Sequence, residues 1–211
     1  MSKTVYLTTP LKREDIEDLA IDDIVYITGD LYTMMYYDHF TRLLDMKAAG
    51  ESLPMELEGA AIYHTGTIFK RREDGSYDFR AIGTTTSSKF NSFTPDLIRK
   101  LGIRAILGKG GMDRATLDAM RECGCVYLAL AGGCSAIYTC KVDRLEKEYW
   151  PESHKSWADN MLKLNVTSYG PLFVSMDAHG NSLYGEAQGV SEDRRDMIYK
   201  KLGIKSKGRE S

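Results

Sequence analysis

The sequence lacks several features that would place it at once in a functional class. Its 211 residues carry a formal net charge of −2, so it has no excess of basic residues of the kind that binds nucleic acid. No apolar run approaches the roughly 20 residues that a membrane span requires. The first residues, MSKTVYLTTP, have no apolar stretch typical of a secretory signal. We therefore expect a cytoplasmic protein without a nucleic-acid or membrane partner.

Cysteine and histidine are also scarce, which limits metal and disulfide chemistry. The four cysteines follow a C-x-C and then a C-x5-C spacing, which is typical of neither zinc nor ferredoxin sites. Disulfides are not expected without a secretory signal. Buried free thiols are the favoured interpretation, and a metal site is the alternative. The residues concerned are Cys123, Cys125, Cys134 and Cys140. No two histidines have the i, i+4 spacing of a helical metal site.

Strand–loop–helix units fill the middle of the chain, over residues 79–101, 103–123 and 126–145. Ile103–Leu107 and Val126–Ala131 are apolar runs that end at glycines, as buried parallel strands do. Ser135–Leu145 is compatible with a helix. The pattern predicts an α/β fold with parallel strands in part of its sheet.

An antiparallel portion is expected as well, so the sheet should be mixed. Asp74 and Gly75 separate the extended runs Ile68–Arg72 and Ser76–Ile82, which is a hairpin signal. Two further strands are expected over Leu162–Val166 and Leu172–Asp177. One domain over residues 1–186 should be followed by a polar tail, 187–211, with a terminal helix over Arg194–Leu202 and a frayed end over Lys207–Ser211.

One polar stretch, Ile82–Thr94 (IGTTTSSKFNSFT), interrupts this pattern. We call residues Gly83–Lys89 the hydroxyl-rich loop. Thr94 is a plausible N-cap of a helix over Pro95–Leu101, ended by Gly102. The loop offers backbone N–H groups, hydroxyls and one cation, which suit a carboxylate or phosphate. A solvated, capped turn is the alternative.

A second cation follows the next strand. Lys109 stands in Gly108-Lys109-Gly110-Gly111, which lacks the spacing of a P-loop. Ligands bind at the carboxyl ends of strands in such sheets, where the hydroxyl-rich loop, Gly108–Gly111 and Gly132–Cys134 should meet. A solvated lysine in a tight turn is the alternative. We expect a carboxylate or sulfate to bind near five residues: Thr85, Thr86, Ser87, Lys89 and Lys109. Because no complete catalytic set appears, the chain should contribute half of a site.

Segments spread along the chain carry a resemblance to a known family. They include LTTPLKREDIEDLAIDDIVYITG, LPMELEGAAIYHTG, GTTTSSKFNSFTP, ILGKGGM, VYLALAGGCSA and YGPLFVSMDAHGNSLY. In order and spacing the chain resembles, over roughly residues 4–186, the beta subunit or C-terminal domain of class I iron–sulfur hydro-lyases. These are the class I fumarate hydratases and L(+)-tartrate dehydratases.

The resemblance implies a swivelling β/β/α domain that closes over a partner. An alpha subunit would hold a four-iron four-sulfur cluster with three cysteines, and its open iron would act as a Lewis acid on a hydroxy-acid substrate. The chain itself would bind no cluster and would work in a homo- or hetero-oligomer. Thr85, Thr86 and Lys89 match substrate contacts of the family, Lys109 matches the lysine of its glycine turn, and Thr85 is the expected catalytic residue.

Three positions depart from the family's pattern. Where the family has arginine, aspartate and a following histidine, this chain has Met35, Tyr36 and His39, and the loop arginine is Lys89. His39 is retained as a substrate-binding candidate. Methionine donates no hydrogen bond, and lysine is a point charge without the two-pronged geometry of arginine. We therefore expect that one substrate carboxylate loses its contact here and that another is bound more weakly. The alternatives to a hydro-lyase subunit are a non-catalytic anion-binding relative and an enzyme that uses its own cysteines.

Overall fold

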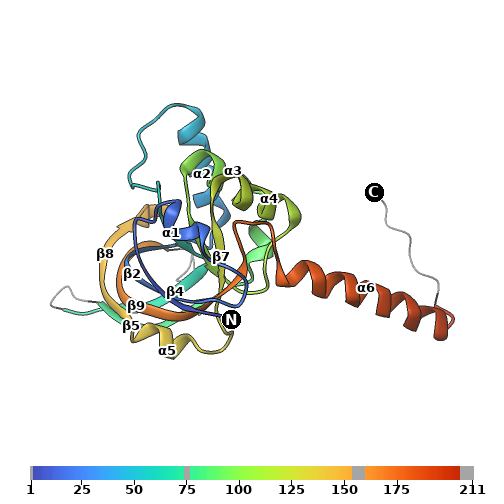
Figure 1. Cartoon of the computed structure of the whole chain (residues 1–211). Coiled ribbons are helices and arrows are strands. Elements are labelled where there is room, and N and C mark those ends of the chain that lie inside the picture. The colour runs from blue at the N-terminus through green and yellow to red at the C-terminus, as the bar shows by residue number, and fades with distance from the viewer. Residues whose placement is uncertain (1, 74–76, 154–159, 205–211) are drawn as a thin grey trace.

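A mixed sheet, a separate hairpin and a group of helices make up the structure, a computed structural model that describes residues 2–73, 77–153 and 160–204 (Figure 1). The α/β class and the mixed sheet predicted from the sequence are confirmed. The strands are β1 (Thr4–Thr8), β2 (Ile24–Thr33), β3 (Ala61–Tyr63), β4 (Thr65–Arg71), β5 (Tyr77–Thr84), β6 (Ala105–Gly108), β7 (Val126–Ala129), β8 (Val142–Tyr149) and β9 (Met161–Met176). The α-helices are α1 (Glu14–Glu17), α2 (Tyr37–Ala48), α3 (Thr94–Leu101), α4 (Arg114–Cys123), α5 (Ser135–Thr139) and α6 (Leu183–Lys201).

The large sheet closes on itself through its longest strand. Its strand order is β1-β2-β3-β6-β7-β9-β8, and β9 pairs with β2 as well as with β7 and β8. The pairs from β1 to β7 are parallel and those of β9 are antiparallel. β4 and β5 form the second sheet, an antiparallel pair. The parallel strands therefore end together, next to the hairpin.

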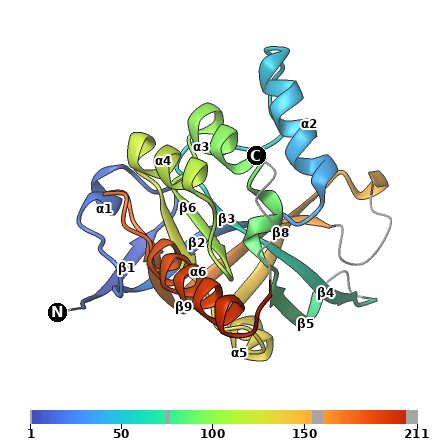
Figure 2. The same ribbon diagram turned by 90° about the vertical axis from the view of Figure 1, so that its right-hand side faces the viewer.

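Successive side chains of the short parallel strands point to opposite faces of the sheet, which divides the interior into two cores. Ile62, Ile106 and Tyr127, one from each of β3, β6 and β7, pack with the apolar residues of α2, α3 and α4. Their neighbours in sequence, such as Tyr63 and Leu128, pack with residues of β2 and β9 on the other face. Both faces are buried, which explains why these strands read as continuous apolar runs. Figure 2 shows α2, α3 and α4 together on one side of the strands.

Two expectations in the second half of the chain are wrong. Only Ser135–Thr139 of the expected helix is helical, and Val142–Tyr149 is instead strand β8 at the edge of the sheet. Its charged residues favour a helix locally, but pairing with β9 overrides that preference. The two strands expected around Gly170 and Pro171 are one continuous strand, β9.

The first strand–loop–helix unit also differs from expectation. β5 belongs to the β4–β5 hairpin and not to the parallel sheet, so only the units around β6 and β7 lie in it. The hairpin itself is confirmed, while Asp74 and Gly75 at its turn lie outside the described residues. Helix α3 and its left-handed end at Gly102 are confirmed, although the Thr94 hydroxyl donates to the Phe90 carbonyl oxygen instead of capping the helix.

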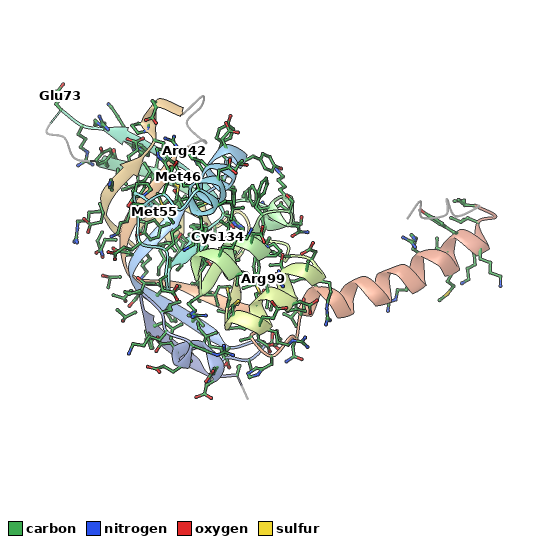
Figure 3. The ribbon with its side chains drawn as sticks, turned by 90° about the horizontal axis from the view of Figure 1, so that it is seen from above. Arg42, Met46, Met55, Glu73, Arg99 and Cys134 are labelled. Atoms are coloured by element: carbon green, nitrogen blue, oxygen red, sulfur yellow. The ribbon has the colours of Figure 1, made fainter. Side chains whose placement is uncertain are left out.

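The last helix extends away from the rest of the molecule. α6 begins at Leu183, earlier than the expected Arg194, so the expected boundary at residue 186 falls inside it. It projects on one side, and the end of the β4–β5 hairpin, marked by Glu73, projects on the other (Figure 3). The expected frayed end, Lys207–Ser211, lies outside the described residues. In the described part of the chain, no helix combines the length and apolarity needed to cross a membrane.

Candidate functional site

The hydroxyl-rich loop lies against the ends of two parallel strands. The Thr85 N–H donates to the His64 carbonyl oxygen just past β3, at 2.9 Å. The Lys109 N–H donates to the Thr85 carbonyl oxygen at 3.3 Å, and the Ser87 N–H donates to the Lys109 carbonyl oxygen at 3.0 Å. Thr86 and Lys109 thus form an isolated parallel bridge. The sequence predicted that the hydroxyl-rich loop and Gly108–Gly111 would meet, and the two loops do lie side by side.

The third expected loop also reaches Lys109. A methyl group on Gly132, which follows β7, would lie 3.8 Å from Lys109 Cδ. The Lys109 side chain is half-buried, so its aliphatic part lies beside this loop. Lys89 differs, because it is exposed and stands in the short 3-10 helix Ser87–Phe90. Lys109 is therefore the cation that the backbone ties directly to Thr85 and Thr86.

Ser87 faces inward and anchors the loop. Its Oγ lies 2.9 Å from His64 Nδ1 and accepts a hydrogen bond from the Tyr127 hydroxyl at 2.8 Å. All three residues are completely buried. A β-carbon on Gly108 would overlap Ser87 Oγ, so only glycine allows this close approach. Ser87 was expected to be an anion ligand, and its hydroxyl is instead occupied by these two partners.

Burial keeps this network uncharged. Loss of solvent lowers the pKa of His64 to about 3 and raises the pKa of Tyr127. The His64 ring packs against Phe90 and Phe40, with ring centres 4.7 and 5.9 Å apart. A neutral imidazole at neutral pH suits a structural hydrogen bond better than proton transfer. We assign His64, Ser87 and Tyr127 the role of holding the loop against β6 and β7.

On its other side the loop borders a small pocket. The Met35 pocket, as we call it, has a volume of about 170 Å³. Its lining comes from the β2–α2 connection, the β4–β5 hairpin and the start of the hydroxyl-rich loop. The lining residues are Met35, Gly66, Ile68, Ala81, Gly83, Thr84 and Thr85. Met35 therefore shares a pocket with Thr85.

His39, the remaining candidate, lies elsewhere. It is buried on α2, and its ring centre is 5.8 Å from that of Trp150 and 5.6 Å from that of Tyr36. It borders a different pocket, of about 530 Å³, that runs along α2 and includes Asp38 and Arg42. The structure thus brings Thr85, Thr86 and Lys109 together, but it does not place His39 in the Met35 pocket.

The four cysteines are free, as expected. Cys125 is buried, and burial raises the pKa of its thiol, whereas Cys123 and Cys134 are half-buried. The expectation of burial is wrong for Cys140, which is exposed at the end of a short surface helix. Within the ranges 2–73, 77–153 and 160–204, no group of three or more His, Cys, Asp or Glu side chains is placed to hold a metal ion.

Sequence reasoning missed His64, Tyr127 and Gly108 as partners of the loop. His64 and Tyr127 lie 23 and 40 residues from Ser87, so no local spacing links them. The available signal was the polar side chains in two mainly apolar runs, AAIYH and VYLALA. A buried polar side chain needs a hydrogen-bond partner, and the serine of the neighbouring loop supplies it.

Comparison with known proteins assigns the family. The family described as Fumarase C-terminus matches residues 1–187. The L(+)-tartrate dehydratase subunit beta of Shigella sonnei is 33% identical over 196 residues, which cover 93% of this chain and 94% of that protein. A putative L(+)-tartrate dehydratase subunit beta of Methanocaldococcus jannaschii is 36% identical over 197 residues, covering 93% and 96%.

A longer protein matches as well. A putative fumarate hydratase class I of Geobacillus stearothermophilus is 34% identical over 192 residues, which are 91% of this chain but 36% of that protein. The same unit therefore occurs as a separate beta subunit and as part of a larger chain. On these matches, the chain belongs to the Fumarase C-terminus family.

Proposed function

We propose that this chain is the beta subunit of a hydro-lyase of the tartrate dehydratase and class I fumarate hydratase type. Its substrate would be a hydroxy acid, from which water is reversibly removed. The proposal is supported by the family and by the names of the relatives. The observation that carries it is the backbone bridge that sets Thr85 and Thr86 beside Lys109.

In this reaction the substrate loses a proton from one carbon and hydroxide from the next. The C–H electron pair becomes the second bond of the new C=C, and the hydroxide takes up a proton and leaves as water. We assign carboxylate binding to the Lys109 ammonium, with Lys89 and the Thr86 hydroxyl as further contacts. Thr85 would move the proton at carbon. The protons balance if the Thr85 hydroxyl takes up the proton from carbon while its own proton passes to the departing hydroxide, which leaves as water.

The cofactor and partner belong to the same proposal. The four-iron four-sulfur cluster would be held by an alpha subunit, and the two chains would form a hetero-oligomer. The described residues of this chain do not fit a cluster, since they contain no converging set of three ligands. Anaerobic reconstitution of the chain alone should therefore give no stable iron–sulfur absorption. A stoichiometric cluster on its own cysteines would overturn this part. The free thiols suit the reducing cytoplasm.

Dehydration by the reconstituted complex with its alpha subunit tests the function. The complex should convert at least one member of a panel of hydroxy acids, and Thr85→Ala should lower kcat by about 100-fold or more. Thr85→Ser, which keeps the hydroxyl, is the matched control and should retain most of the rate. Unchanged turnover in Thr85→Ala would remove Thr85 from catalysis. No turnover of any acid by the cluster-loaded complex would favour a non-catalytic anion-binding role.

A further inference from the structure

The Met35 pocket arises from small residues facing each other across the hairpin. Gly66 of β4 pairs with Gly83 of β5, and Ile68 pairs with Ala81. Residues two apart on a strand point to the same face, so these four share one face of the hairpin. A β-carbon on Gly83 would meet no atom within 4 Å, which shows that the space beside it is empty. Met35 covers this space from the β2–α2 connection.

The lining of this pocket carries no ionisable group. It consists of a thioether, two aliphatic side chains, two glycines and the hydroxyls of Thr84 and Thr85. A carboxylate that entered it would give up hydration without gaining a cation, which is costly. An alkyl or neutral polar group would enter at no such cost and would gain from leaving water. The lining that this chain supplies therefore favours an uncharged group over a carboxylate.

Thr85 connects this pocket to the cation. Its side chain lines the pocket, and its carbonyl oxygen accepts the hydrogen bond from the Lys109 N–H. The backbone of Lys109 thus lies directly beside Thr85, and a ligand that extends from the pocket past Thr85 would approach this lysine with its other end. The pocket volume of about 170 Å³ leaves room for the uncharged end of a small acid.

We propose that the Met35 pocket receives an uncharged end of the substrate. The substrate class is then hydroxy acids with a single carboxylate, held at Lys109, and an alkyl or neutral polar group at the opposite end. This inference rests on the proposed hydro-lyase function and names its substrate class. Met35 and Gly83 determine the specificity, and neither takes part in the bond changes.

The first test fills the pocket from its open side. Gly83→Val should be tolerated, because the glycine has no left-handed backbone and the new side chain meets empty space. In the complex with the alpha subunit, it should lower kcat/KM at least tenfold for monocarboxylic hydroxy acids with a longer uncharged end. The shortest such acids should be affected less. Gly185→Val on α6 is the matched control, because a β-carbon there also meets nothing within 4 Å. It should leave kcat/KM unchanged for both the longer and the shortest acids.

The second test brings a cation to the pocket. Met35→Arg should raise the affinity for a dicarboxylic hydroxy acid relative to a monocarboxylic one about tenfold or more. Met35→Leu, which keeps the apolar lining, should leave that ratio unchanged. Affinity is read from ligand-induced shifts in melting temperature as well as from KM, and the melting temperature without ligand shows whether the fold is intact. If Met35→Arg folds and the ratio does not change, Met35 does not determine specificity and the inference is wrong.

The wild-type complex separates this inference from the function on which it rests. Preference for monocarboxylic hydroxy acids supports both. Equal or better turnover of malate- or tartrate-like dicarboxylates overturns the inference and leaves the hydro-lyase function standing. If the cluster-loaded complex converts no hydroxy acid, the function fails and the substrate class fails with it.

Discussion

The two sides of the hydroxyl-rich loop differ in chemistry and in solvent access. On the inner side, Ser87 is completely buried and hydrogen-bonded to His64 and Tyr127. On the outer side, Thr85 is half-buried and borders a pocket without charged residues. Similar hydroxyl side chains in one short loop thus have opposite roles. The inner one holds the backbone through its two partners, and we propose that the outer ones contact a ligand beside Lys109.

Enlarging Gly108 should disturb the inner side most. A β-carbon there would overlap Ser87 Oγ, with the Tyr127 hydroxyl close by. Gly108→Ala should therefore lower the free energy of unfolding by about 3 kcal/mol, as overpacking of a filled core does. Urea denaturation measures this change. Gly132→Ala is the control, because its methyl group would make only ordinary contacts, and equal losses in the two variants would contradict the account.

The pH dependence of stability should report on His64. Its pKa is about 3 in the folded protein, below the 6.5 of an exposed histidine, so the unfolded chain binds the proton more tightly. The stabilisation is complete above pH 6.5 and is lost as the pH falls towards 3. Because of this group, the free energy of unfolding at pH 5 should be about 2 kcal/mol lower than at pH 7.5. His64→Asn does not titrate, so its stability should fall less over this range; parallel curves for the two proteins would rule out the buried neutral imidazole.

Removing one hydroxyl should have a smaller effect that stays on the inner side. Tyr127→Phe keeps the ring and deletes the donor to Ser87, which should cost about 1 kcal/mol of unfolding free energy. Tyr6→Phe, at an exposed tyrosine, should cost much less. Ligand affinity at the outer side should change little in Tyr127→Phe. A large loss of affinity without a loss of stability would mean that the two sides are not separate.

Much of this arrangement could be predicted from local sequence. Apolar runs ending at glycines located β6 and β7, and the rule that ligands bind at strand ends brought the hydroxyl-rich loop next to Lys109. The hairpin followed from Asp74 and Gly75 between two extended runs. These features depend on short-range periodicity and turn chemistry, which a single sequence displays directly.

Other features depend on distant pairing and could not be predicted. Val142–Tyr149 is a strand only because β9 lies beside it, since its own charged residues favour a helix. The inward direction of Ser87 depends on His64 and Tyr127, which are remote in sequence. The position of Met35 at the pocket depends on how the β2–α2 connection crosses the hairpin. In each case tertiary contacts determine the result.

The affinity of the assembled complex for a hydroxy acid, measured for wild type and Lys109→Met, tests the central claim most directly. Lys109 is the cation that hydrogen bonds tie to Thr85 and Ser87, so its loss should weaken binding of the carboxylate about 10- to 100-fold. Lys47→Met, at an exposed lysine of α2, is the matched control and should bind as wild type does. If Lys109→Met folds normally and binds the acid with unchanged affinity, the loop beside Lys109 is not the carboxylate site and the account is wrong.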